Sequence, residues 1–94
     1  MESIIELRHL KTLLALEETG SVSLAAQRVF LTQSALSHQI RTLENYYETP
    51  LFERKSNPLR FTPAGARLLK LARELMPKVA AAERDMAQII EGEA

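Results

Sequence analysis

The chain has 94 residues, a formal net charge of zero at pH 7 and no cysteine, which predicts about one domain and excludes a disulfide framework and thiolate metal sites. The N-terminus mixes acidic and basic residues instead of forming a secretory signal, and no apolar run is long enough to span a bilayer. We therefore expect a soluble cytoplasmic protein without a membrane partner.

Two short helices are predicted at the N-terminus. Leucines at helical spacing indicate a first helix over about residues 6–18, and Gly20 follows it as a left-handed C-cap. Ser21 then supplies an N-cap oxygen for a second helix over about residues 22–29.

A third helix is predicted to begin after the N-cap Thr32 and to end near residues 48–49, before Pro50. Spacings of three and four place on one apolar, buried face Leu36, Ile40, Leu43 and Tyr47. Hydrogen-bonding side chains without an acid occupy a separate face, made of Gln33, Ser34, Ser37, His38 and Arg41. Residues 25–44 thus have the pattern of a helix-turn-helix DNA reader.

The polar face of this third helix suits the edges of DNA bases. An amide such as Gln33 pairs bidentately with adenine, Ser and His donate or accept at base edges, and Arg41 is placed for a phosphate. The alternative is a polar face that is only solvated, but such faces favour strong helix formers, which these exposed positions lack.

A hairpin and a long helix follow. Alternating runs at 51–54 and 59–61, separated by turn residues, predict a two-stranded wing. Thr62 and Pro63 together start a helix that runs toward Ile90, and Pro77 inside it predicts a kink or local break.

The long helix carries a heptad seam. Its positions follow alternating spacings of four and three and comprise Leu68, Ala72, Leu75, Val79, Ala82, Met86 and Ile89. A seam of this length predicts a partner helix from a second copy of the chain. The alternative is that the helix folds back on its own domain.

The zero net charge argues against nucleic-acid binding, because binders usually have a basic excess. The distribution of the charged residues along the chain partly answers this objection. No Asp or Glu occurs over residues 19–43 or 54–73, while acids gather near both ends of the chain. A chain with a net charge of zero can therefore have one positive surface and one negative surface.

Several motifs together resemble one family over nearly the whole chain. They are, in order, LRHLKTLLAL, GSVSLAAQRVFLTQSALSHQIRTLE, LFERK and LRFTPAG. These segments resemble the N-terminal DNA-binding domain of LysR-type transcriptional regulators. Within that family, SALSHQ and RKSNPLRFTPAG are most similar to regulators of methionine biosynthesis.

The resemblance implies a mainly α fold, with a winged helix-turn-helix of three helices and a two-stranded wing in residues 1–61 and a linker helix for dimerisation in residues 62–94. Linker helices of the family pack antiparallel in a homodimer, and tetramers form in the full-length proteins. A C-terminal effector-binding domain, through which a small-molecule effector would act, is absent from this chain.

The resemblance also assigns roles to residues. Base reading in the major groove falls to Gln33, Ser34, Ser37 and His38, and DNA-backbone contacts to Ser21, Ser23, Thr32 and Arg41. In the wing, Arg54 with Lys55 would enter the minor groove, and the dimer would read an interrupted inverted repeat. Two departures from the family pattern are His38 where many members have Arg, and Tyr47-Glu48 in place of Leu-Gly, so the third helix is expected to end differently.

Other functional classes find little support. His9 and His38 belong to different helices, and the side chains of Ser37 and His38 diverge, so we predict no enzyme, catalytic residue, cofactor or metal site. A protein-interaction module is the better rival. The acid-free window over residues 19–43 argues against it, because a protein-binding face has no need of such a window.

Overall fold

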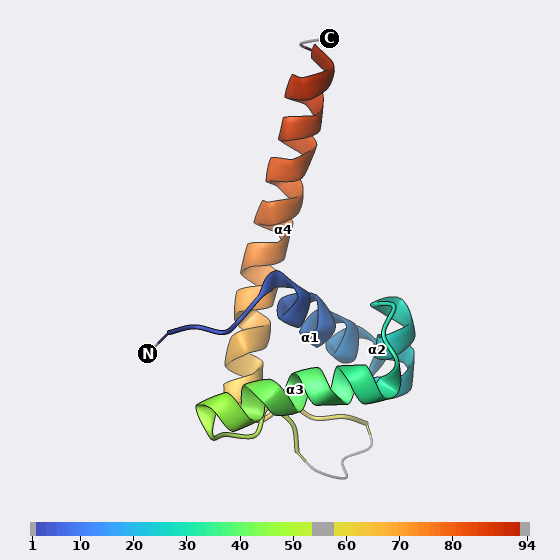
Figure 1. The fold of residues 1–94 in the computed structure, drawn as a ribbon, viewed down its shortest axis with the longest axis vertical. Coiled ribbons are helices and arrows are strands. Elements are labelled where there is room, and N and C mark those ends of the chain that lie inside the picture. Colours follow the sequence, from blue (N-terminus) through green and yellow to red (C-terminus); the bar gives the residue numbers. More distant parts are fainter. Residues whose placement is uncertain (1, 54–57, 93–94) are drawn as a thin grey trace.

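The computed structural model describes residues 2–53 and 58–92 and contains, within those ranges, four helices. They are α1 (Leu7–Thr19), α2 (Val22–Arg28), α3 (Gln33–Tyr47) and α4 (Pro63–Gly92). Figure 1 shows α1, α2 and α3 gathered into a head at one end of α4, which continues as a rod toward the C-terminus. The mainly helical class and the order of helices confirm the prediction.

The predicted caps set the helix ends. The hydroxyl oxygens of Ser21, Thr32 and Thr62 each accept a backbone N–H three residues further on, at 3.2, 3.0 and 3.2 Å. Gly20 has a φ of 66°, the left-handed conformation that ends α1 without a Cβ clash. These side chains satisfy amide groups that have no partner inside a helix.

The core of the head lies where α1 packs against α2, α3 and the first turns of α4. Leu13 of α1 and Leu43 of α3 have no exposed surface. Ala25 and Ala26 are buried in α2, where their small side chains allow a close approach to α1. Burial of the Leu36–Ile40–Leu43 face of α3 confirms the apolar side of that helix and leaves its other side outward.

A histidine completes the start of α1. The backbone N–H of Glu6 donates to Nδ1 of His9 at 2.9 Å, and His9 is only 4% exposed. Burial lowers the pKa of His9 below its ordinary value of 6.5; Glu6 raises it in part and Arg8 lowers it further. His9 is thus held as a neutral acceptor that caps α1.

The segment between α3 and α4 contains one antiparallel bridge, between Phe52 and Phe61. The N–H of Glu53 donates to the carbonyl of Arg60 at 2.9 Å, and the two phenylalanine rings lie 4.6 Å apart. The described residues on either side of the 54–57 gap form no strand. The predicted two-stranded wing is therefore represented by this single bridge.

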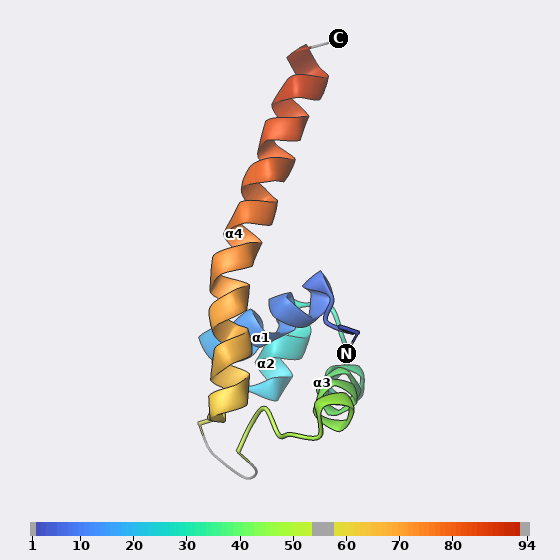
Figure 2. The same ribbon diagram turned by 90° about the vertical axis from the view of Figure 1, so that its left-hand side faces the viewer.

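Helix α4 runs without interruption through Pro77, so the local break expected there does not occur. Proline removes one backbone donor, and the turns on both sides keep their helical hydrogen bonds. Figure 2 shows the second half of α4 projecting beyond the head.

The first half of α4 corrects the seam prediction. Ala72 has no exposed surface, and Leu68 and Leu75 are half-buried against the core of their own head. A fully buried residue cannot contact a second chain, so the assignment of Ala72 to a dimer interface is wrong. Leu68 and Leu75 keep part of their surface exposed, so their assignment to a dimer interface stays a prediction.

Candidate nucleic-acid interface

The outward face of α3 is the candidate surface for base edges. Gln33, Ser34 and His38 are exposed on it, as the sequence predicted. Ser37 is half-buried and lines a cleft of about 720 Å³, to which α3, the segment that follows it, α1 and α2 all contribute. The structure thus places all four predicted base-reading residues on one helix face, and three of them are fully accessible.

The start of α3 is suited to an anion. Its first turn contains no acidic residue, and Thr32 caps only one of its free amide groups. Free N–H groups and the positive end of the helix dipole favour phosphate at such an end. This end lies beside the exposed Gln33 and Ser34.

The predicted backbone-contacting residues differ in accessibility. Ser23, Thr32 and Arg41 are exposed, and Ser21 is half-buried. The oxygens of Ser21 and Thr32 accept backbone N–H groups, so each hydroxyl hydrogen is still able to point outward and donate to a phosphate. Capping and phosphate contact are therefore compatible for both residues.

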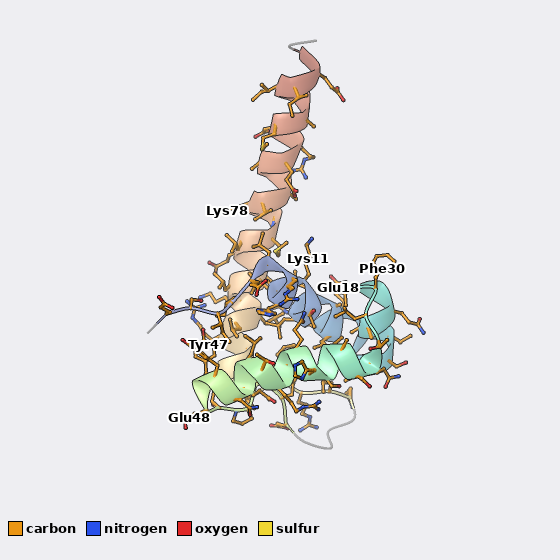
Figure 3. All side chains as sticks on the ribbon, viewed as in Figure 1. Lys11, Glu18, Phe30, Tyr47, Glu48 and Lys78 are labelled. Carbon is orange, nitrogen blue, oxygen red and sulfur yellow. The ribbon has the colours of Figure 1, made fainter. Side chains whose placement is uncertain are left out.

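Two exposed residues at the helix ends adopt left-handed backbone conformations, and Figure 3 labels both. Phe30, in the turn between α2 and α3, has a φ of 59° and is 94% exposed, which the sequence analysis did not foresee. Glu48 follows α3 with a φ of 52°. Its N–H donates to the carbonyl of Asn45 at 3.3 Å, and the next N–H, that of Thr49, donates to the carbonyl of Glu44 at 3.0 Å.

This pair of bonds is the usual ending of a helix that stops at glycine. The expectation that α3 ends differently without a glycine is therefore wrong: Glu48 adopts the conformation that glycine would take, against the preference of an L-residue.

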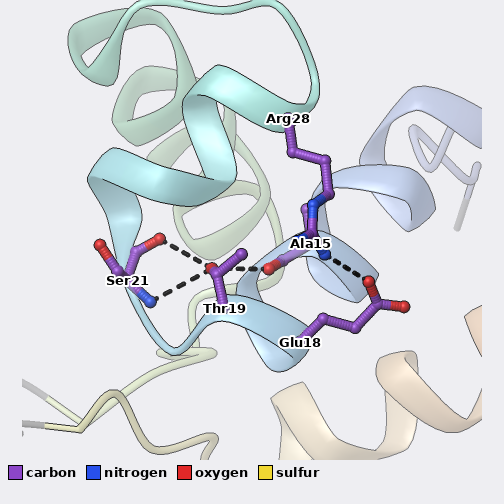
Figure 4. A network of polar contacts seen from close by, with 5 residues as sticks. All are labelled: Ala15, Glu18, Thr19, Ser21 and Arg28. Carbon is purple, nitrogen blue, oxygen red and sulfur yellow. Dashed lines mark hydrogen bonds and ion pairs between the residues drawn. The ribbon is translucent and has the colours of Figure 1, made fainter.

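The positive charge near α3 is smaller than the acid-free window suggested. Figure 4 shows the ion pair between Arg28 and Glu18, which joins α2 to α1. In the same view the Thr19 hydroxyl lies 2.8 Å from the carbonyl oxygen of Ala15 and 3.0 Å from that of Ser21. Arg28 is therefore exposed but paired with an acid, and Arg41 is the other exposed arginine of this window.

A polar junction fixes the base of the wing to two helices. Oε2 of Glu44, on α3, accepts the N–H of Leu51 at 2.7 Å. From the start of α4, Thr62 donates its N–H to the carbonyl of Leu51 at 3.0 Å and its hydroxyl to the carbonyl of Pro50 at 2.7 Å. A Cβ at Gly65 would lie 2.0 Å from the carbonyl oxygen of Leu51.

Sequence reasoning missed this junction. The signal for it was the glycine in the first turns of a long helix, where a glycine is otherwise unfavourable. The predicted minor-groove residues of the wing, Arg54 and Lys55, lie outside the described residues.

None of the helices in residues 2–53 and 58–92 combines the length and the hydrophobicity that a membrane span requires. Nor do three or more His, Cys, Asp or Glu side chains of residues 2–53 and 58–92 come together as a metal site would require.

Comparison with known proteins decides the family. Residues 7–66, which span the three helices of the head, the wing segment and the start of α4, match the bacterial regulatory helix-turn-helix proteins of the lysR family. The chain belongs to the LysR family. Within this LysR-type domain, α3 is the second helix of the helix-turn-helix.

Two relatives of this LysR-type domain share the name MetR. The chain is 68% identical over 92 residues to the HTH-type transcriptional regulator MetR of Haemophilus influenzae, a match that covers 98% of this chain and 30% of that protein. It is 52% identical over 79 residues to MetR of Escherichia coli K12, covering 84% of this chain and 25% of that protein. The chain therefore spans less than a third of the length of these curated relatives.

Solved structures share the fold of the LysR-type domain. The DNA-binding domain of BenM, in a complex with catB site 1 DNA, superposes with a TM-score of 0.84 at 33% identity, covering 96% of this chain and 97% of that one. Vibrio fischeri DarR in complex with DNA gives a TM-score of 0.81 at 30% identity and covers 95% of this chain and 30% of that one. The chain is thus a LysR-type helix-turn-helix DNA-binding domain similar to those of the MetR regulators.

Proposed function

We propose that two copies of this domain bind one operator as a homodimer and read an interrupted inverted repeat. In each copy α3 enters the major groove, where Gln33, Ser34, Ser37 and His38 meet base edges. Ser21, Ser23, Thr32 and Arg41 contact the DNA backbone. Arg54 enters the minor groove from the wing, with Lys55 beside it. An arginine in this position favours a narrow, A·T-rich minor groove.

The observation that carries this proposal is the division of α3 into two faces. Leu36 and Leu43 are buried against the head, while Gln33 and His38 point away from it. The polar face of α3 begins at a helix end suited to phosphate. The structural neighbours of this chain include proteins that were solved in complex with DNA.

The genes that this domain controls are inferred from its similarity to one group of regulators within the family. Because the most similar curated relatives are MetR regulators, we assign the domain to the control of methionine biosynthesis in the bacterial cytoplasm. We propose further that a small-molecule effector acts through a domain outside this chain, and that dimers of the full-length protein associate into tetramers.

A selection experiment tests the proposal. The chain is incubated with random DNA duplexes, and the bound fraction is sequenced over several rounds. We expect two half-sites in inverted orientation with a fixed gap, and retention on a duplex column that falls steeply with salt. Failure to bind duplex DNA at low salt would favour the protein-interaction module instead.

The wing is tested separately, by Arg54→Ala. We expect weaker binding and a dependence of log K on log salt that is flatter by about one unit, because one phosphate-region cation is lost. Unchanged affinity together with an unchanged slope would remove Arg54 from the interface.

A further inference from the structure

The cleft beside α3 is large enough for a small molecule. Its volume is about 720 Å³, and it is lined by α3 and by the segment that follows this helix, with contributions from α1 and α2. Cavities that bind small molecules usually have volumes of about 300–1,000 Å³. Of the residues that line this cleft, the proposed function uses only Ser37 and Arg41. We call this space the α3 cleft.

Much of the lining of the α3 cleft is apolar. Its apolar side chains come from four parts of the chain and are those of Leu16, Val22, Leu36, Ile40, Phe52 and Leu59. Three of them, Val22, Phe52 and Leu59, keep part of their surface exposed. An aromatic or alkyl group in the cleft would remove this apolar surface from water, which is favourable.

The polar lining of the α3 cleft contains more acids than bases. Its charged side chains are those of Arg41, Glu44, Glu48 and Glu53. Arg41 lies about 10 Å along the helix axis from Glu48, so Glu44 and Glu48 make the C-terminal end of the α3 edge acidic. Oε2 of Glu44 accepts the N–H of Leu51 at 2.7 Å, which fixes the position of this carboxylate. Carboxylates repel the phosphates of DNA, so DNA binding does not account for this acidic end.

We propose that the α3 cleft binds a small amphipathic cation, an amine that carries an aromatic or alkyl group, and that the bound amine opposes DNA binding. The apolar group lies against Leu36 and Ile40, and the ammonium group faces Glu44 and Glu48. An anion of the same shape is repelled by these carboxylates, and a neutral molecule gains only the apolar contact. The site itself does not depend on the proposed function.

The opposition to DNA binding rests on the proposed function. Ser37 and Arg41 line the same cleft and are assigned there to a base edge and to the DNA backbone. A molecule in the cleft occupies space next to both side chains. The duplex and the amine therefore compete for one side of α3.

Three probe molecules that differ mainly in charge test the site. They are 4-phenylbutylamine, 4-phenylbutan-1-ol and 4-phenylbutyrate, which share a phenyl ring on a short alkyl chain. Each is titrated into the isotope-labelled chain, and the amide resonances are followed by NMR. We expect the amine to shift the resonances of Ser37, Asn45 and Leu59 in a saturable way, with a Kd of roughly 1 mM, as is ordinary for a molecule of this size. Resonances of residues 80–92 should stay in place.

The order of the three affinities decides the charge preference. We expect 4-phenylbutyrate to bind roughly tenfold more weakly than the amine, and the alcohol to lie between them. Equal affinities, or tighter binding of 4-phenylbutyrate, would overturn the proposal, and so would the absence of saturable shifts with the amine.

A matched pair of substitutions locates the ammonium group. Glu48→Gln removes one carboxylate from the α3 cleft, and Glu74→Gln makes the same chemical change on α4, outside the cleft. Both residues are exposed, so both variants should keep the helical circular dichroism of the parent. We expect Glu48→Gln to raise the Kd of the amine about threefold, and Glu74→Gln to leave it unchanged. Equal effects of the two variants would contradict the site.

Competition with DNA tests the second part of the proposal. The affinity for the selected operator is measured by fluorescence anisotropy with 4-phenylbutylamine and, as a control for ionic strength, with the same concentration of ethylamine. We expect 4-phenylbutylamine to weaken operator binding more than ethylamine does. Saturable NMR shifts without this excess would overturn the competition and leave the site standing. A chain that binds no duplex at all would overturn the proposed function and the competition, while the NMR titration would still decide the site.

Discussion

Two polar residues of this domain differ in what their side chains can contact, because one is exposed and the other is buried. Gln33 is exposed on α3 and makes none of the hydrogen bonds found within the described chain, so its amide is free for a ligand. His9 is buried, and its Nδ1 is already used by the N–H of Glu6. The side chain of Gln33 is therefore available for the proposed base contact, whereas that of His9 is used within the fold.

Replacing Gln33 by Ala is expected to weaken binding to the selected operator by about 1 to 3 kcal/mol, because a bidentate contact to a base is lost. Binding to random duplex should change little. Fluorescence anisotropy with both duplexes, at one salt concentration, measures the difference. Equal losses on the two duplexes would show that Gln33 contacts the backbone and not a base.

The buried His9 makes stability depend on pH. Because its pKa is lowered in the folded state, chiefly by burial, the unfolded chain binds the proton more readily. The contribution of His9 is fully present above pH 6.5, its ordinary pKa, and is lost as the pH falls from there through the folded-state value.

His9→Gln should remove this part of the pH dependence, since Gln at the same position can accept the N–H of Glu6 and does not titrate. Urea unfolding of both proteins at pH 8 and pH 5 measures it. The loss between the two pH values should be smaller in the variant. An identical loss would mean that carboxylates alone cause it.

At the scale of elements, two close contacts decide how α3 and α4 are joined. The end of α3 depends on the left-handed conformation of Glu48, and the start of α4 depends on the absence of a side chain at Gly65. Between them, Glu44 and Thr62 hold the base of the wing at Leu51. These contacts set the angle between α3 and α4.

Glu48→Gly is expected to stabilise the domain by about 0.5 to 1 kcal/mol. Relief of the left-handed strain outweighs the entropy that glycine loses on folding. Chemical denaturation measures the change. The opposite control is Glu74→Gly, in the exposed interior of α4, which should cost about 1 kcal/mol. A loss of stability in Glu48→Gly would show that the Glu side chain has a stabilising contact.

Gly65→Ala is expected to destabilise the domain by about 1 to 3 kcal/mol, because its Cβ would lie 2.0 Å from the carbonyl oxygen of Leu51 and α4 must shift. Gly92→Ala makes the same chemical change where a Cβ meets no atom within 4 Å, and it should cost nothing. Thermal unfolding of the two variants provides the comparison. Equal midpoints would contradict the tight junction.

At the scale of the whole molecule, the domain is a head that contains α3 and a rod formed by the rest of α4. Its extents of 53 × 32 × 20 Å reflect the length of α4. In a symmetric dimer the rods fix the separation of the two heads, and hence of the two α3 helices. A rigid separation requires a matching spacing of half-sites on DNA.

Changing the gap of the selected inverted repeat by about five base pairs, half a helical turn, should lower the affinity roughly tenfold or more, because the second head then faces the wrong side of the duplex. Changing it by a full turn tests the rigidity of the rods. Gel-shift titration on matched duplexes measures both. Affinity that is independent of the gap would show that the heads bind singly.

The sequence by itself determined the local structure. Caps and periodicity are properties of short segments, so Ser21, Thr32 and Thr62 marked the helix starts and the 3–4 spacing of leucines marked the buried face of α3. The motifs also indicated the LysR family, which the comparisons confirm.

Only the tertiary structure decided which part of the heptad seam is covered. A heptad pattern indicates an apolar stripe along a helix. It does not indicate whether the helix that covers this stripe belongs to the same chain or to another. Packing against α1 buries Ala72, while Met86, Ile89 and Ile90 are left to solvent because the head ends before them. The pairing of Arg28 with Glu18 and the contact at Gly65 were hidden for the same reason: each depends on atoms from another segment brought close by the fold.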